Sequence, residues 1–299
     1  MQIAEEEGVE LFVPCGGVWL ARSAAGFEAR SASDLRDLQI PAELLAPEDV
    51  AQFFPHVRCD DLAFALYEPL AGVLRATTCV RTLIGRALRH GAQLRTARAR
   101  PSGAGVQLDN GEHLVADRVV WACGPWLPAI FAGRLDLRSV KQSVFYFGAD
   151  PRWTTPPVPA WIDDSGDGYG LGDLDGNGVK AVHVKPEDGP DFDPDHGERI
   201  PEPGALARTR ELLGHRFPSL AAAPLVATRV CQYELTGDRH FVIAPTDETA
   251  REWIVGGGSG HGFKHGPAVG EYVADLLEGR RRPRAAFALD RGGCHEQPA

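Results

Sequence analysis

The spacing of apolar side chains along the chain changes between a helical and a strand-like period. Residues 76–94 place apolar positions three and four apart, which predicts a helix ending at Gly91, and residues 92–99 then predict a strand. Residues 139–148 alternate with a period of two, as an antiparallel strand does. Residues 203–220 return to the helical period. The chain is therefore expected to mix βα steps with antiparallel β-structure.

Turn residues mark where the strands end. Two β-rich runs in residues 9–22 are separated by Gly16 and Gly17, which predicts a hairpin. The Asp-Asn-Gly run at 109–111 predicts a tight turn. The run "RVVWACG" (118–124) then predicts a buried strand ending on glycine, as in the central sheet of a nucleotide-binding α/β domain. We expect an α/β fold of mixed α+β character, with two domains woven from discontinuous segments.

Charge and cysteine content narrow the class of protein. The 299-residue chain carries a net charge of −10, which argues against a nucleic-acid or anionic-membrane surface. No signal peptide or membrane-spanning run is visible. Six cysteines are scattered without a C-x-x-C pair, which is typical of reduced thiols. These features predict a soluble, cytoplasmic protein.

The run "GGGSGHGFKHG" (256–266) invites several interpretations, and its spacing excludes most of them. A dinucleotide-binding G-x-G-x-x-G would need glycine where His261 and Phe263 stand. A hydrolase G-x-S-x-G around Ser259 fails at His261, and no Walker A run exists. His261 and His265 lack acidic or cysteine neighbours, so no metal site is expected.

A second run, "DLDGNGVKAVHV" (173–184), matches the first half of a calcium-binding EF-hand loop. The closing position should be a glutamate that binds the ion with both oxygens, and it is Val184. This run therefore predicts a hairpin turn.

The glycine-rich run sits between a predicted strand and a predicted helix. "EWIVG" (252–256) predicts a buried strand, and Pro267 suits the first turn of a helix whose apolar stripe runs from Val269 to Leu277. Backbone N–H groups and a positive dipole end are available at such a helix start, and Lys264 adds a full charge. The loop therefore suits an anionic ligand, or one that becomes anionic during a reaction.

Two stretches in this order carry a specific resemblance: "CQYELTGDRHFVIAP" (231–245) and "WIVGGGSGHGFKHGPAVGEYVADLL" (253–277). Together they resemble the D-amino-acid-oxidase superfamily of FAD-dependent oxidoreductases, within it the monomeric sarcosine oxidase and N-methyltryptophan oxidase group. Weaker similarity covers most of the remaining chain, including "YGLGDLDGNGVKAVH" (169–183). FAD is the cofactor that this resemblance implies.

The resemblance implies roles for individual residues around the flavin. Cys231 falls where family members carry a thioether to the flavin, and the alternative is an inert strand cysteine. Lys264 falls where a lysine faces the substrate carboxylate, and the alternative is a surface lysine. The backbone of the loop would line the ring and stabilise its reduced, negative edge. The loop residues expected to bind the cofactor are Gly258, Ser259, Gly260, His261, Gly262, Phe263 and Lys264.

Three further residues are expected near the reacting atoms. Lys180 matches the family's lysine that activates dioxygen, where a positive charge stabilises superoxide as it forms; a solvated lysine is the alternative. His183 follows it at a spacing that varies within the family. Tyr169 is expected to form a pocket wall, or equally to be a core tyrosine.

The resemblance also implies how the chain divides. Residues 1–74 and 139–227 correspond to the substrate domain, and residues 75–138 and 228–299 to an FAD-binding, Rossmann-like domain. The family's G-x-G-x-x-G strand and helix, which hold the ADP half of FAD, have no counterpart here, and Met1 is expected to fall within a helix. A parallel sheet lacking that strand would expose an apolar edge.

Three functional hypotheses follow from these residues. In the first, the chain is an FAD-dependent amine oxidase that oxidises the C–N bond of a secondary amine or N-alkyl amino acid and reduces dioxygen to hydrogen peroxide. In the second, it is a non-catalytic remnant, or a subunit that needs a partner chain supplying the dinucleotide-binding segment. In the third, it is a flavin dehydrogenase of the same fold.

Overall fold

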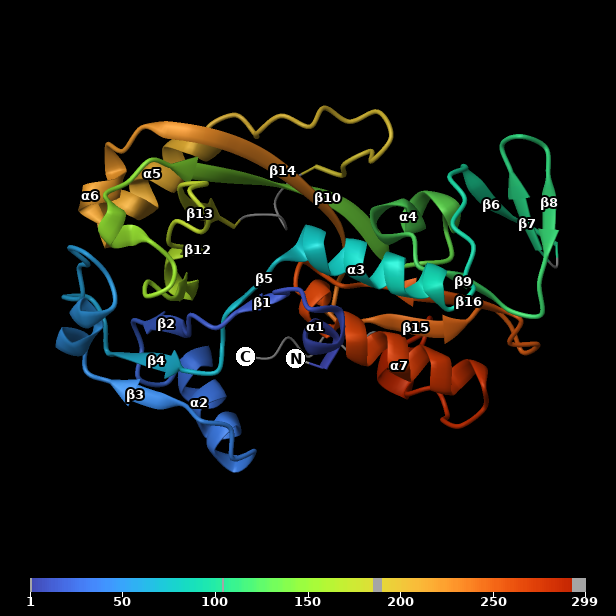
Figure 1. Cartoon of the computed structure of the whole chain (residues 1–299), viewed down its shortest axis with the longest axis horizontal. Helices are drawn as coiled ribbons and strands as arrows, with labels where there is room; N and C mark the ends of the chain where they lie inside the picture. The colour runs from blue at the N-terminus through green and yellow to red at the C-terminus, as the bar shows by residue number, and fades with distance from the viewer. Residues whose placement is uncertain (1, 104, 185–189, 292–299) are drawn as a thin grey trace. The chain divides into compact units, whose positions relative to one another are not determined.

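The computed structural model describes residues 2–103, 105–184 and 190–291, which form parts of two compact units (Figure 1). Unit 1 comprises Met1–Thr82, Gln142–Asp188 and Glu198–Cys231, and unit 2 comprises Leu83–Lys141, Gly189–Gly197 and Gln232–Ala299. Each unit combines segments that are far apart in the sequence, and the mixed helix-and-strand fold class is confirmed. The expectation that Met1 falls within a helix lies outside the described residues, as does the sixth of the scattered cysteines, Cys294.

An eight-stranded sheet forms the frame of unit 1 (Figure 1). Its neighbours are antiparallel where their pairing is described, except that β11 runs parallel to β2. Both β10 and β14 continue along the chain into residues of unit 2. In spatial order the strands are β14 (Leu225–Thr236), β10 (Leu137–Phe147), β13 (Val179–His183), β12 (Gly168–Leu171), β11 (Ala160–Asp163), β2 (Gly17–Ala21), β4 (Phe64–Glu68) and β3 (Glu43–Leu45).

One face of this sheet packs against helices, and the opposite face carries both buried and partly exposed side chains, among them the buried Val144 and Val182. Successive strand residues point to opposite faces, so Phe145 and Phe147 of β10 share a face with Val179 and Ala181 of β13. These side chains join Phe217 and neighbouring residues of the helical segment in one buried cluster. The packed face is covered by α5 (Ala205–Arg216) and α6 (Pro218–Ala221).

A buried ion network fixes this helical cover to the sheet. The side chains of Arg216 and Asp163 are both fully buried and lie 3.0 Å apart. Arg216 also donates to Asp61 at 2.7 Å, and Arg22 lies 3.2 Å from Asp163. Burial alone would raise the pKa of Asp61, but hydrogen bonds from Arg216 and His215 outweigh it and lower that pKa to about 2. The carboxylate of Asp61 therefore stays charged at any ordinary pH.

Shorter elements complete unit 1. The predicted hairpin in residues 9–22 is wrong, because the first run pairs with β5 and the second with β4, so neither pairs with the other. The EF-hand-like run is confirmed as a hairpin turn, with the Gly178 N–H donating to Asp173 at 3.0 Å. The remaining elements are α1 (Gln2–Glu7), β1 (Phe12–Val13), α2 (Phe27–Asp37), the 3₁₀ helix η1 (Pro47–Gln52) and β5 (Val73–Leu74).

Unit 2 is built on a small sheet in the order β15-β16-β9, in which β16 and β9 are parallel. Tyr272 and Leu276 of α7 pack on one side with Trp253, and Trp121 and Ile254 lie in the cluster on the other. A separate three-stranded meander contains the predicted turn at Gly111. The elements are β6 (Ala99–Ser102), β7 (Gly105–Leu108), β8 (His113–Val115), β9 (Val119–Trp121), α4 (Leu127–Ile130), β15 (Val242–Pro245), β16 (Glu252–Gly256) and α7 (Gly266–Leu277).

The helix α3 (Ala76–Arg89) forms as predicted, but its apolar stripe is exposed. The strand expected at residues 92–99 is absent from 92–98. The strand predicted within residues 118–124 forms as β9, but it lies at the edge of its sheet with Val120 37% exposed, so it is not fully buried as predicted. A strand needs a partner for its backbone groups, and residues 92–98 have no strand beside them in the described chain. The exposed side chains of the stripe are Val80 (45%), Leu83 (43%), Ile84 (38%) and Leu88 (44%).

Replacing Asp163 with asparagine should destabilise the protein strongly, because Arg216 would keep its buried charge and lose one of two carboxylates. Breaking a buried pair by removing one partner costs about 3 kcal/mol or more. Urea unfolding measures the loss. Glu112→Gln, which breaks the exposed pair with Arg95, should leave the unfolding midpoint nearly unchanged. Equal midpoints for the two variants would show that the buried network does not stabilise the fold.

Candidate active site

The face of the unit 1 sheet opposite α5 and α6 carries the first group of predicted site residues. Lys180 on β13 is the register partner of Tyr146 on β10, so both side chains project from the face opposite Phe145 and Phe147. Tyr169 on β12 shares this face, and the Lys180 Nζ lies 5.2 Å from the centre of its ring. The structure thus brings Lys180 and Tyr169 together, as two of the predicted site residues.

Partial burial sets the electrostatics of this pair. Burial lowers the pKa of Lys180, because a desolvated ammonium is costly. Burial also raises the pKa of Tyr169 to about 12, with smaller contributions from Cys231 and Tyr146. Tyr169 therefore remains a neutral phenol, and its ring face offers the Lys180 ammonium a favourable cation–π contact.

Cys231 lies on β14, the strand next to β10 (Figure 1). Its thiol is free and exposed, so the alternative of an inert buried cysteine is not what the structure shows. Cys231 leaves the sheet on the same face as Tyr146 and Lys180, because it follows Arg229 by two residues and Arg229 lies against the Tyr146 ring. Arg229 stands two residues before Cys231, and its guanidinium carbon lies 5.8 Å from the Tyr146 ring centre.

The structure does not bring His183 to the same place. It follows Lys180 by three residues, so strand alternation puts its side chain on the opposite face. Its register partner is Gly168, which packs toward Leu212 of α5. His183 is therefore on the packed side of the sheet, away from Tyr169 and Lys180.

The glycine-rich loop belongs to unit 2, where the end of β14 anchors it. The N–H of Gly258 donates to the buried carboxylate of Glu234 at 3.1 Å, and the Ser259 N–H donates to the Glu234 carbonyl oxygen at 3.1 Å. The Ser259 hydroxyl, in a residue only 7% exposed, lies 3.2 Å from the hydroxyl of Thr236. Gly258 and Ser259 thus have their polar groups occupied in shaping the loop.

Other parts of the loop keep their polar groups available. Within the described chain, the N–H groups of Gly260 and Gly262 have no hydrogen-bond partner. Gly260 adopts a φ of +80°, and a side chain there would meet the ring of Tyr233 at 3.3 Å. Phe263 and Lys264 are exposed in the 3₁₀ turn η5 (Gly262–His265), which separates the glycines from α7. The loop therefore precedes the helix by one extra turn.

The histidines of the loop contact an aromatic side chain. The rings of His261 and His265 lie 5.9 and 5.7 Å from Phe241, and the Nε2 of His261 lies 3.2 Å from the Arg239 carbonyl oxygen. Burial, followed by the charge of Lys264, lowers the pKa of His265. The described residues contain no group of three side chains able to hold a metal ion.

Unit 2 also contains a large cleft of about 1100 Å³. Alanines form much of its wall, and Trp126 and Ile130 line it further. At its rim, Asp195 accepts from the Trp126 indole at 2.9 Å and pairs with Arg98 at 2.8 Å. The cleft lies at the upper end of the range for small-molecule sites, so it is large enough for an extended ligand.

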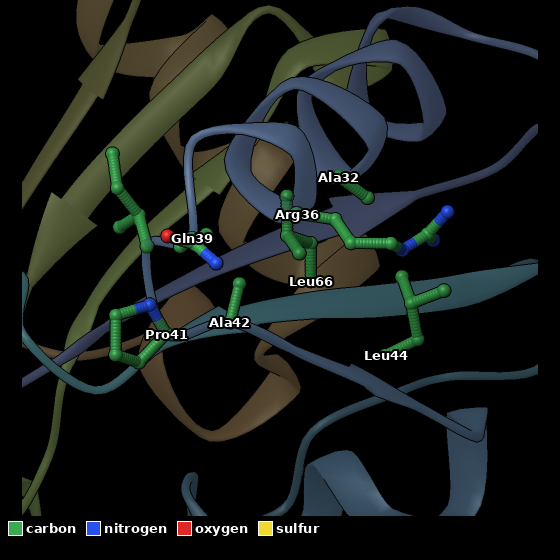
Figure 2. Close-up of a pocket in the computed structure, with 8 residues that line it drawn as sticks. Ala32, Arg36, Gln39, Pro41, Ala42, Leu44 and Leu66 are labelled. Carbon is green, nitrogen blue, oxygen red and sulfur yellow. The ribbon is translucent and has the colours of Figure 1, made fainter.

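A smaller hollow of about 290 Å³ lies between α2 and the β3–β4 edge of unit 1 (Figure 2). Figure 2 shows Leu44 and Leu66 beside it, with the Arg36 side chain extending across it. None of the predicted site residues lines this hollow. No helix in the described part of the chain is both long and apolar enough to span a membrane.

Comparison with known proteins shows the family of this chain. The sequence profile of the FAD dependent oxidoreductase family, DAO, matches residues 1–276. The chain belongs to this family. It is therefore an FAD-dependent oxidoreductase, and the expected fold class and cofactor are confirmed.

Individual relatives show how far the similarity extends. The chain is 28% identical over 292 residues to a monomeric sarcosine oxidase of Streptomyces avermitilis, covering 92% of this chain and 75% of the relative. It is 25% identical over 310 residues to an N-methyl-L-tryptophan oxidase of Yersinia pestis, covering 97% of this chain and 80% of the relative. The fold is also similar to L-proline dehydrogenase from P. horikoshii, with a TM-score of 0.80 at 20% identity, covering 97% of this chain and 79% of that one.

Sequence reasoning missed Glu234, Thr236, Tyr146 and Arg229. Glu234 and Thr236 hold the loop, and their role appears only when β14 and the loop are seen together. Arg229 carried a signal, because it stands two residues before Cys231 on one strand and so shares its face. Tyr146 gave none, because its pairing with Lys180 joins strands more than thirty residues apart.

Replacing Gly260 with alanine should lower the free energy of unfolding, because its φ is positive and Tyr233 is close. A side chain in this backbone region costs about 1–2 kcal/mol. Gly266→Ala is the matched control, since Gly266 begins α7 at a φ of −46° with open space around it. Urea unfolding of both variants tests the difference. Equal stability of the two variants would contradict the strained geometry of the loop.

Proposed function

We propose that the protein is an amine oxidase that acts on a secondary amine or an N-alkyl amino acid. The amine would lose two electrons and two protons to become an imine, which water hydrolyses, and dioxygen would gain two electrons and two protons to become hydrogen peroxide. A bound flavin would supply the redox chemistry by accepting the electrons from the carbon next to nitrogen. The observation that carries this proposal is the shared sheet face from which Cys231, Lys180 and Tyr169 project.

The unit 2 loop supports a place for the ring system of the cofactor. Among the described residues, the N–H groups of Gly260 and Gly262 have no hydrogen-bond partner. The positive φ of Gly260 favours glycine, so this position carries no side chain that could cover the two N–H groups. Donors of this kind stabilise negative charge that develops on an acceptor edge. We assign Gly260, His261, Gly262 and Phe263 to contacts with the ring, and give Gly258 and Ser259 the task of supporting them.

The charged residues have separate tasks in this proposal. Lys264 is exposed in η5, directly before α7, and there it would pair with the substrate carboxylate. Lys180 would stabilise the negative charge that forms on dioxygen, because a desolvated ammonium acts more strongly than a hydrated one. Tyr169 would form a wall of the pocket and hold Lys180 against its ring.

A second candidate function is a subunit that binds FAD together with a partner chain. The exposed apolar stripe of α3 favours it, because contiguous apolar surface of this kind marks a contact site. The free edge of β9 also favours it, since an unpaired strand is a template for another. The partner would supply the dinucleotide-binding strand and helix.

Purified chain incubated with FAD should retain flavin absorbance on the polypeptide after acid precipitation, because the exposed Cys231 thiol is free to form the thioether. Cys231→Ser should release all flavin on precipitation, while Cys123→Ser, in unit 2, should retain it. Flavin bound but released from the wild type would refute the covalent link. A chain that binds no flavin at all would support the subunit interpretation.

Replacing Lys180 with methionine should slow reoxidation of the reduced flavin by oxygen about a hundredfold or more, because one preorganised charge is lost. Reduction by substrate should change far less. Stopped-flow absorbance separates the two half-reactions. In the wild type, reoxidation should slow as the pH rises through the lowered pKa of Lys180, and this dependence should vanish in the variant. Equal losses in both half-reactions would contradict the assigned role, and slow reoxidation in the wild type would favour a dehydrogenase.

A further inference from the structure

The face of the unit 1 sheet opposite α5 and α6 carries cations and aromatic rings in alternation. Arg229 on β14 lies over the ring of Tyr146 on β10, with 5.8 Å between the guanidinium carbon and the ring centre. Tyr146 is the register partner of Lys180 on β13, and Lys180 lies 5.2 Å from the Tyr169 ring centre on β12. Four neighbouring strands thus present cation, ring, cation and ring in that order.

Among the described residues, neither cation of this row pairs with an acid. Within the described chain, Arg229 and Lys180 form no ion pair with a carboxylate, and each has an uncharged ring as its recorded contact. Other arginines of unit 1, including Arg22, Arg75 and Arg216, do have carboxylate partners. The positive charge at this face is therefore available for a ligand.

The row stands beside the proposed reaction site. Cys231 follows Arg229 by two residues on the same strand, so the two side chains leave the sheet on the same side. Since Arg229 and Lys180 are separated by the β10 strand, about 10 Å lies between their strands. Arg229 is thus placed to contact a part of the substrate that Lys180 does not reach.

We propose that Arg229 is a specificity residue that binds a second carboxylate on the substrate. This inference rests on the proposed amine oxidation and names its substrate class as N-alkyl amino acids with an acidic side chain. The planar guanidinium forms two parallel hydrogen bonds to a carboxylate, and the Tyr146 ring beneath it limits how the fork can turn.

Equilibrium binding to the flavin-loaded protein tests the substrate class. The probes are N-methyl-L-glutamate and N-methyl-L-glutamine, which differ in one carboxylate and match in shape. The wild type should bind N-methyl-L-glutamate more tightly than N-methyl-L-glutamine. Arg229→Gln should weaken the affinity for N-methyl-L-glutamate about tenfold and leave the affinity for N-methyl-L-glutamine unchanged. The control Arg36→Gln removes another exposed arginine, which lies on α2 beside β3 and β4, the strands at the opposite end of the sheet from β14. It should alter the affinity for neither probe.

A second measurement requires neither flavin nor turnover. Cys231 is alkylated with iodoacetate, which is anionic, and with iodoacetamide, which is neutral, and peptide mass spectrometry gives both rates. The ratio of rates cancels differences in thiol exposure and ionisation. Arg229→Gln should lower this ratio several-fold, Arg229→Lys should largely restore it, and Arg36→Gln should leave it at the wild-type value.

The outcomes separate this inference from the proposed function. In Arg229→Gln, a lowered ratio of iodoacetate to iodoacetamide alkylation and a selective loss of N-methyl-L-glutamate binding support Arg229 as the residue that binds the second carboxylate. If neither probe is oxidised, these results still support that role, while the proposed oxidation fails. Equal binding of both probes to the wild type overturns the inference even if both are oxidised. An alkylation ratio unaffected by Arg229→Gln overturns it as well, because the guanidinium would then not act at Cys231.

Discussion

The packing of one face of the unit 1 sheet against α5 and α6 is the constraint on which the proposed chemistry depends. Strand residues alternate between faces, so burying Phe145, Val179 and Ala181 commits Tyr146 and Lys180 to the other side. The buried Arg216–Asp163 pair fixes which face is covered. A shift of register by one residue would bury the ammonium of Lys180 in the core. The same packing that forms the core therefore presents the functional row.

The strand β14 links this row to the glycine-rich loop along the chain. Its first part carries Arg229 and Cys231, and its last part carries Glu234 and Thr236, which hold the loop through a carboxylate and a hydroxyl. Conformational entropy lost on ordering a glycine-rich loop is large, so such anchors are needed if its N–H groups are to be preorganised. One strand thus supplies reactive residues to unit 1 and anchoring residues to unit 2.

Local signals predicted much of this structure, and long-range pairing decided the rest. The helix after Pro267, the turn at Gly111 and the hairpin at 173–184 follow from nearby residues, and all three form. The hairpin at 9–22 was wrong because both runs pair with distant strands, which a local pattern does not reveal. Strand parity alone separates His183 from Lys180, whereas the contacts of Glu234 and Tyr146 need the fold.

Aromatic partners explain how two cations are kept on one face without acids. A carboxylate beside Lys180 or Arg229 would stabilise the charge but also cancel its field, leaving little attraction for another anion. A ring face offsets part of the desolvation cost and adds no net charge, so the field remains. Because the two cations stand on different strands, one charge is free to act on dioxygen while the other selects the substrate. Selectivity and oxygen reactivity are therefore separable by single substitutions on this face.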